Sequence, residues 1–320
     1  MHARYVLSRL LQFIGVLLVL SFLIFSLLYL VPGDLVKILV GNRQVTPEVR
    51  QAITAQYHLD DPFIVQYVDW LGRALHADFG TSIRSGTPVT QVIGQRLPLT
   101  LELTFLAFVI ALGVGIPLGL LAARKIDSRV DRAIVGWAVV GISAPGFALG
   151  MVLLYVFAVM LGWFPTYGTG GSFLDTLWHL TLPAIALATG TAATIIRITR
   201  ASVARELTQD YVTFAQSRGL SRRRITGMYM KNAAIPIITS AGLILGSLFG
   251  ATILVEEAFS LPGLGQLLAD SITFKDVPVV QALALLIALV IITVTFVVDL
   301  LAAVLDPTQN LGANHSRRIV

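Results

Sequence analysis

The titratable side chains of this 320-residue sequence are too few and too scattered to form a catalytic or metal-binding cluster. No two of its five histidines stand at the i, i+4 spacing that places two metal ligands on one helix face. Cysteine is absent, which removes disulfides, thiolate nucleophiles and zinc–cysteine sites. The sequence also lacks a phosphate-binding loop and a G-x-S-x-G nucleophile elbow. We therefore expect a chain that is not an enzyme and holds no metal or cofactor of its own.

Three sets of charged residues remain as candidates for a functional site. Asp299 is the one acid well inside an apolar segment, where a carboxylate is by default a functional hypothesis. It lies about 10 Å along a helix from Asp306, so it can also reach the membrane surface in a packing or capping role. Glu256 and Glu257 precede a Pro-Gly turn and form either a solvated helix end or an external gate. The third set is the run Arg222 to Arg224.

The composition indicates that these residues belong to a membrane protein. Apolar residues make up 56% of the chain and charged residues only 13%, and the mean hydropathy is +0.81. Soluble chains are nearly half apolar and about a quarter charged. Six segments have the roughly 20 apolar residues that a bilayer span needs. They are 10–31, 101–123, 133–161, 182–199, 236–255 and 281–305. The first is longer than a signal-peptide core and lacks an A-x-A cleavage site, so we expect it to be retained.

The distribution of basic residues predicts the orientation. The N-terminus, the second loop, the fourth loop and the tail carry 2, 4, 8 and 2 of the 23 lysines and arginines. Because basic residues accumulate on the cytoplasmic side, both termini and the arginine run are expected there. No aromatic platform or nucleic-acid module accompanies the run, which argues against nucleic-acid binding.

Small residues and prolines mark the predicted spans. Glycines at four-residue spacing allow helix backbones to approach closely, in plain bundle packing or in a sliding seam. They are Gly115 and Gly119, Gly146 and Gly150, and Gly242, Gly246 and Gly250. Pro117, Pro145 and Pro183 are expected to interrupt helical hydrogen bonding.

The external loop 32–100 is long enough to fold. Within it, Phe63, Tyr67, Trp70 and Leu71 form one apolar stripe on a helix that starts after Asp61-Pro62. This stripe suits a small cap that rests on the bundle, or a docking surface.

The cytoplasmic loop 200–235 predicts two short helical segments. In the first, Thr208 is the expected cap, Asp210 lies in the first turn, and Tyr211, Phe214 and Ala215 share one face. Gly219 can end that helix in the left-handed conformation, after which Leu220 and Ser221 lead into the next. Arg222, Arg223 and Arg224 then occupy a first turn, where cations oppose the helix dipole. Local stability does not explain them, so we expect lipid headgroups or an acidic partner surface nearby. A short helix with an aromatic knob suits insertion into a partner's groove.

Thirteen short stretches, in order along nearly the whole chain, carry a resemblance to a known family. They include "LVPGD" at 30–34, "YHLDDPFIVQYVDWL" at 57–71, "DFGTS" at 78–82, "ISAPGFALG" at 142–150, "DYVTFAQSRGLS" at 210–221, "NAAIP" at 232–236, "VEEAFSLPGLG" at 255–265 and "DLLAAVLDP" at 299–307. In these stretches the sequence resembles the permease subunits of ABC importers of the dipeptide, oligopeptide and nickel class.

The resemblance implies an all-α membrane protein of six spans, with the type I ABC importer permease fold and one domain over 1–320. It implies half of a peptide pathway in the bacterial inner membrane, beside a second permease, two ATPase subunits that bind ATP and Mg²⁺, and an external substrate-binding protein. It assigns ATPase coupling to the 210–221 segment, in which Asp210, Tyr211, Ala215, Gly219, Leu220 and Ser221 match the family's pattern. To this predicted coupling site we add Phe214, as the aromatic knob, and Arg222, Arg223 and Arg224, as the basic surface behind the helix. The external gate or binding-protein contact would include Glu256, Glu257, Pro262 and Gly263. Where the family usually has Glu-Ala-Ala, this chain has Thr213, Phe214 and Ala215, so the first two positions depart from the pattern.

Two rival functions make different predictions. A secondary transporter driven by an ion gradient would act alone, would depend on Asp299 and would show an internal repeat, which the sequence does not display. A membrane enzyme would need several converging titratable side chains, and Asp299 has no evident partner in the sequence.

Overall fold

The computed structural model describes residues 3–30, 36, 46–56 and 59–305, and this part of the chain is almost entirely helical. The "LVPGD" segment after residue 30 and the tail from Asp306 lie outside the described residues. The helices are α1 Ala3–Leu30, α3 Pro47–Gln56, α4 Phe63–Leu75, α5 Val89–Arg124, α6 Arg129–Ser143, α7 Gly146–Leu153, the π-helix η1 Leu154–Met160, α8 Phe173–Leu207, α9 Asp210–Ser217, α10 Arg222–Ala258, α11 Leu264–Thr273 and α12 Val277–Leu305.

Five of the described helices are long and apolar enough to cross a membrane, as five of the predicted spans require: α1, α5, α8, α10 and α12. Helices α5, α8 and α10 have 36, 35 and 37 residues. At 1.5 Å per residue each is over 50 Å long, well beyond the ~30 Å hydrocarbon core. These helices therefore tilt in the bilayer or extend beyond it.

The predicted third span, 133–161, is not one continuous helix. The chain bends by 101° between α6 and α7. Ala144 is extended, with φ −83° and ψ 122°, and Pro145 is the residue before α7. A residue before proline avoids the helical region, and proline has no amide hydrogen, which accounts for the break. Pro117 and Pro183, by contrast, lie inside α5 and α8. Each removes one backbone donor there without ending the helix, so of the three prolines only Pro145 stands at a break.

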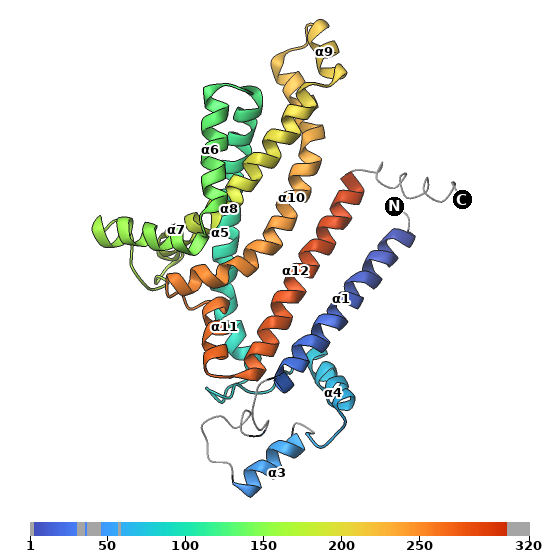
Figure 1. Ribbon diagram of the computed structural model, residues 1–320, viewed down its shortest axis with the longest axis vertical. Coiled ribbons are helices and arrows are strands. Elements are labelled where there is room, and N and C mark those ends of the chain that lie inside the picture. The colour runs from blue at the N-terminus through green and yellow to red at the C-terminus, as the bar shows by residue number, and fades with distance from the viewer. Residues whose placement is uncertain (1–2, 31–35, 37–45, 57–58, 306–320) are drawn as a thin grey trace.

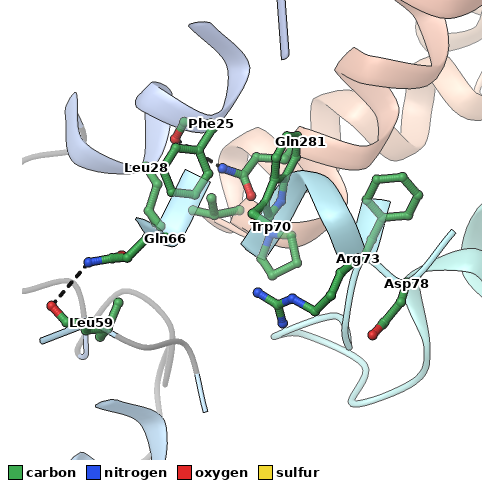
Figure 2. A pocket seen from close by; sticks show the side chains of 11 residues that line it. Phe25, Leu28, Leu59, Gln66, Trp70, Arg73, Asp78 and Gln281 are labelled. Carbon is green, nitrogen blue, oxygen red and sulfur yellow. Dashed lines mark hydrogen bonds between the residues drawn. The ribbon is translucent and has the colours of Figure 1, made fainter. Parts of the chain in front are cut away.

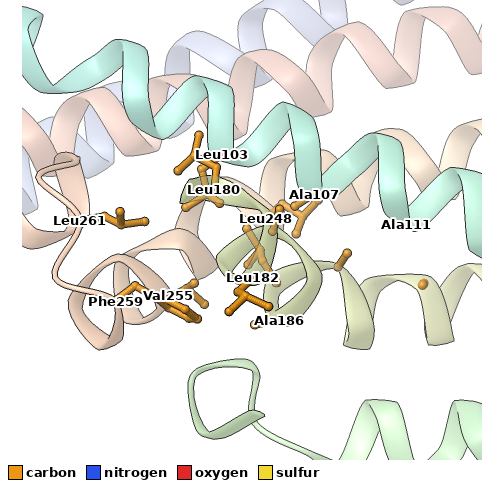
Figure 3. Close-up of a cluster of buried hydrophobic side chains, with 14 of the residues drawn as sticks. Leu103, Ala107, Ala111, Leu180, Leu182, Ala186, Leu248, Val255, Phe259 and Leu261 are labelled. Atoms are coloured by element: carbon orange, nitrogen blue, oxygen red, sulfur yellow. The ribbon is translucent and has the colours of Figure 1, made fainter. Parts of the chain in front are cut away.

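The main core lies where α5, α8 and α10 meet. Figure 3 shows Leu103 and Ala107 of α5, Leu182 and Ala186 of α8, and Leu248 of α10 in this cluster. A Cβ on Gly119 would lie 2.6 Å from Thr199 Cβ, and one on Gly242 would lie 2.1 Å from Val298 Cγ2. These glycines thus serve packing within the chain. Gly250 is different, because its missing Cβ would have no neighbour within 4 Å.

Short helices cover one end of the bundle. Figure 1 places α3, α4 and α11 at the end opposite α9. The predicted stripe on α4 packs on the bundle, with Phe63, Tyr67 and Trp70 against Phe25 of α1. Trp70 of α4, Phe25 of α1 and Gln281 of α12 line a small cavity of about 30 Å³ (Figure 2). The stripe therefore serves as a cap that rests on α1 and α12.

Candidate functional site

Helix α9 connects the long helices α8 and α10 at the end of the bundle opposite α3, α4 and α11 (Figure 1). It projects beyond the other helices at that end. Its first turn contains Asp210, and Gln209 is the residue before it. The prediction that Thr208 caps α9 is wrong, because the Thr208 hydroxyl instead donates to the carbonyl of Arg205 in α8 at 2.9 Å. At the other end Gly219 has φ +69°, the left-handed conformation predicted for it.

The two sides of α9 have opposite environments. Val212 and Ala215 are 1% and 3% exposed, and they pack against Val203, Ile225 and Tyr229. Phe214 is 64% exposed. The predicted face shared by Tyr211, Phe214 and Ala215 is therefore divided, since Phe214 lies about 100° around the helix from Ala215 and projects away from the bundle.

Hydrogen bonds hold the base of α9 in place. The Tyr211 hydroxyl donates to Glu206 Oε2 of α8 at 2.6 Å, and Asn232 Nδ2 of α10 donates to the same oxygen at 3.2 Å. Partial burial raises the pKa of the Tyr211 phenol, and the bond to Glu206 raises it further, so the phenol keeps its proton. The three side chains connect α8, α9 and α10, which gives α9 a fixed orientation.

The arginine run begins α10 directly after this helix. Ser221 stands at the N-cap with extended backbone, but its side chain makes no capping hydrogen bond. Arg222, Arg223 and Arg224 are exposed. No acid of the described chain forms an ion pair with them. Exposed cations at a helix N-terminus with no internal partner are available to an anionic surface outside the chain.

Two further contacts stabilise this end of the bundle, and sequence reasoning missed both. Arg200 of α8 binds Asp131 of α6 in a bidentate pair, with Nε and Nη2 at 2.6 and 2.7 Å from the two carboxylate oxygens. Arg124, at the end of α5, donates to the Tyr229 hydroxyl of α10 at 2.9 Å. The sequence does mark Asp131 as a residue of a helix start, because it stands three residues after Ser128, whose side chain caps α6. Nothing in the sequence pairs it with a residue 69 positions away.

The two glutamates at the opposite end differ sharply. Glu256 has no exposed surface, whereas Glu257 is exposed. The interpretation of both as a solvated helix end is therefore wrong for Glu256. Gly263 is also buried, whereas Pro262 is partly exposed. In this conformation only Glu257 and Pro262 of the four predicted residues can reach a protein docked outside.

Asp299 has a partner, contrary to expectation. Its Oδ2 lies 3.2 Å from Arg9 Nη1 of α1, and the two side chains are 29% and 39% exposed. This ion pair joins α12 to α1. In the described part of the chain, no three His, Asp or Glu side chains gather in an arrangement that could hold a metal ion.

Comparison with known families gives two matches along the chain. Residues 115–310 match the model described as "Binding-protein-dependent transport system inner membrane component", and residues 2–104 match the model of the N-terminal region of such components. An oligopeptide transport system permease protein of Bacillus subtilis is 37% identical over 95% of this chain and 98% of its own. A glutathione transport system permease protein of Salmonella choleraesuis is 40% identical over the same shares.

A solved structure shares the fold. A chain from the inward-facing MetNI methionine ABC transporter superposes with a TM-score of 0.55 and 16% sequence identity. The superposition covers 68% of this chain and 97% of that one. At this identity the likeness supports the arrangement of helices and says nothing of the solute.

Proposed function

Since the chain belongs to the family of binding-protein-dependent transport system inner membrane components, the permease subunits of ABC importers, we propose that it forms half of an inward pathway for peptides or a similar small solute. The names of relatives support this class of solute, because they are described as oligopeptide, glutathione and putative peptide permeases. The family and the fold both argue against the secondary transporter considered above.

The proposed complex contains this chain, a second homologous permease, two ATPase subunits and an external substrate-binding protein. ATP and Mg²⁺ bind to the ATPase subunits, and this chain supplies no catalytic group. Both termini and α9 face the cytoplasm of the cell, in keeping with the basic residues in their loops. The α3, α4 and α11 end then faces outward, toward the binding protein.

The observation that carries the proposal is the division of α9. Its inner side is buried and hydrogen-bonded, which fixes the helix against α8 and α10. Its outer side presents Phe214, an aromatic side chain of the kind that anchors interfaces, beside an unpaired basic surface. We assign to α9 the role of a coupling helix that inserts Phe214 into a groove of an ATPase subunit, with Arg222 to Arg224 in the same contact.

Replacement of Phe214 tests this role. Phe214→Asp should reduce the amount of ATPase subunit that co-purifies with the permease by roughly tenfold or more, because interface aromatic anchors contribute about 2 kcal/mol or more. Gly219→Pro should have the same effect, since proline cannot adopt φ +69°. Both variants should still insert into the membrane.

The matched control is Gln216→Asp, which adds the same charge at an exposed position on another side of α9. It should leave co-purification unchanged. Normal co-purification of Phe214→Asp and Gly219→Pro would contradict the role assigned to α9.

A further inference from the structure

The carboxylate of Glu256 joins three helices at the end of the bundle opposite α9. The Thr100 hydroxyl of α5 donates to Glu256 Oε1 at 2.7 Å, and the Gly265 amide of α11 donates to Oε2 at 2.7 Å. The Leu264 amide donates to Thr100 Oγ1 at 2.8 Å, so the hydroxyl is bound on both sides. Each Glu256 oxygen thus has a donor, as a buried carboxylate requires.

The turn between α10 and α11 is shaped around this carboxylate. A Cβ on Gly263 would lie 2.3 Å from the carboxyl atoms of Glu256. A Cβ on Gly265 would lie 2.3 Å from Ile253 Cα and 2.9 Å from Glu256 Oε2. Both glycines of the Pro-Gly-Leu-Gly segment are therefore needed for the N-terminus of α11 to approach α10 closely. The positive end of the α11 dipole then faces the negative charge.

A second contact connects the same turn to the bent helix α7. Phe259, which is 5% exposed, packs so closely on α7 that a Cβ on Gly150 would lie 2.8 Å from its ring. Figure 3 shows Phe259 and Val255 beside Leu182 and Ala186 of α8. This contact is wholly apolar, and among the described residues no hydrogen bond crosses it.

The two contacts respond differently to movement. A buried carboxylate that loses a donor keeps its full desolvation penalty, so Thr100, Glu256 and the start of α11 must move together. An apolar contact between a ring and a glycine has no directional bonds and can slide or separate at far lower cost. Any opening at this end is therefore expected between Phe259 and α7.

We propose that Glu256 is a positioning residue of the transport cycle, whose buried carboxylate locks α5, α10 and α11 into one rigid gate element that closes against α7 through Phe259. This inference rests on the proposed function. It replaces a surface role for Glu256 with an internal one.

The test uses the complete complex in proteoliposomes, with tri-alanine or glutathione as the solute. Because the chain has no cysteine, Leu261→Cys introduces a single thiol at a site in the turn that is 2% exposed. A membrane-impermeant maleimide then reports how often the turn lifts. The variants Glu256→Gln and Thr100→Val remove the charge or the hydroxyl while they keep the shape. Glu102→Gln is the matched control, since it makes the same change at an exposed glutamate of α5, and Thr100→Ser keeps the hydroxyl.

Glu256→Gln and Thr100→Val should each raise labelling of Cys at position 261 at least tenfold. They should also raise the ATP hydrolysed per solute imported at least tenfold, because closure no longer follows the ATPase cycle. Glu102→Gln and Thr100→Ser should match the parent. Equal labelling in Glu256→Gln and Glu102→Gln would overturn the proposal. So would a uniform fall in uptake, ATP hydrolysis and complex yield with unchanged labelling, which would indicate a folding role alone. Failure of the proposed function itself would appear separately, as a parent complex without ATP-dependent uptake.

Discussion

At the scale of single residues, the ion pair between Asp131 and Arg200 is the strongest polar contact near the α9 end. Asp131 is 2% exposed and also accepts a hydrogen bond from the Asp127 amide at 2.9 Å. A bidentate arginine–carboxylate pair fixes the relative rotation of two helices, because both hydrogen bonds must be kept together. Here those helices are α6, which precedes the 101° bend, and α8, which leads to α9.

Asp131→Asn should therefore destabilise the protein. Loss of one partner from a buried pair costs about 3–5 kcal/mol, and the partial exposure of Arg200 reduces this to roughly 2–3 kcal/mol. Thermal unfolding of the detergent-solubilised protein measures the change. Asp127→Asn is the control, because that exposed side chain forms no ion pair with any described residue and its φ of +62° suits asparagine. Equal melting temperatures for both variants would show that the pair contributes nothing.

The sequence predicted local features of single residues and failed on their distant partners. Gly219 in the left-handed conformation follows from capping rules, which depend only on neighbours in the chain. Glu256 was placed beside its Pro-Gly turn, yet its burial depends on Thr100, 156 positions away. Periodicity along one helix cannot reveal a donor on another, so the two glutamates appeared equivalent.

At the scale of elements, the close pairing of α5 with α8 depends on glycines that leave room for β-branched neighbours. A methyl group on Gly119 would meet Thr199 Cβ at 2.6 Å and the carbonyl oxygen of Ile196 at 2.8 Å. The second of these is backbone, so it cannot move aside without shifting α8. Gly113 lies on the same helix with nothing within 4 Å of its missing Cβ.

The pair Gly119→Ala and Gly113→Ala separates packing from helix propensity. Gly119→Ala should lower stability by about 1–3 kcal/mol, the usual cost of overpacking. Gly113→Ala should be neutral or stabilising by up to about 1 kcal/mol, because alanine favours the helix. Thermal melting and the yield of monodisperse protein are the measurements. A stable Gly119→Ala would show that α5 and α8 can separate freely.

The elements that sequence patterns located best are the long apolar helices and α4. Their periodicity and composition are strong and local. The bend between α6 and α7 was missed, because 133–161 is apolar throughout and composition does not distinguish a straight span from a bent one. The sequence predicted an interruption at Pro145, but it predicted the same at Pro117 and Pro183, which lie inside the continuous helices α5 and α8. Proline alone therefore did not identify the bend.

At the scale of the whole molecule, the two ends of the bundle have different constructions. The α9 end presents an exposed aromatic side chain and unpaired arginines on a helix held by hydrogen bonds. The opposite end is closed by α11 and a buried carboxylate. This asymmetry suits a protein in which an event at one end is transmitted along continuous helices such as α10, which runs from the arginine run to Glu256.

The most direct test of the account is uptake by the purified chain and its partner subunits in proteoliposomes, with and without ATP. We predict uptake of tri-alanine or glutathione only when the second permease, the ATPase subunits, the binding protein and hydrolysable ATP are all present, with no effect of a proton or sodium gradient. Uptake by this chain alone, driven by such a gradient and indifferent to ATP, would contradict the central claim.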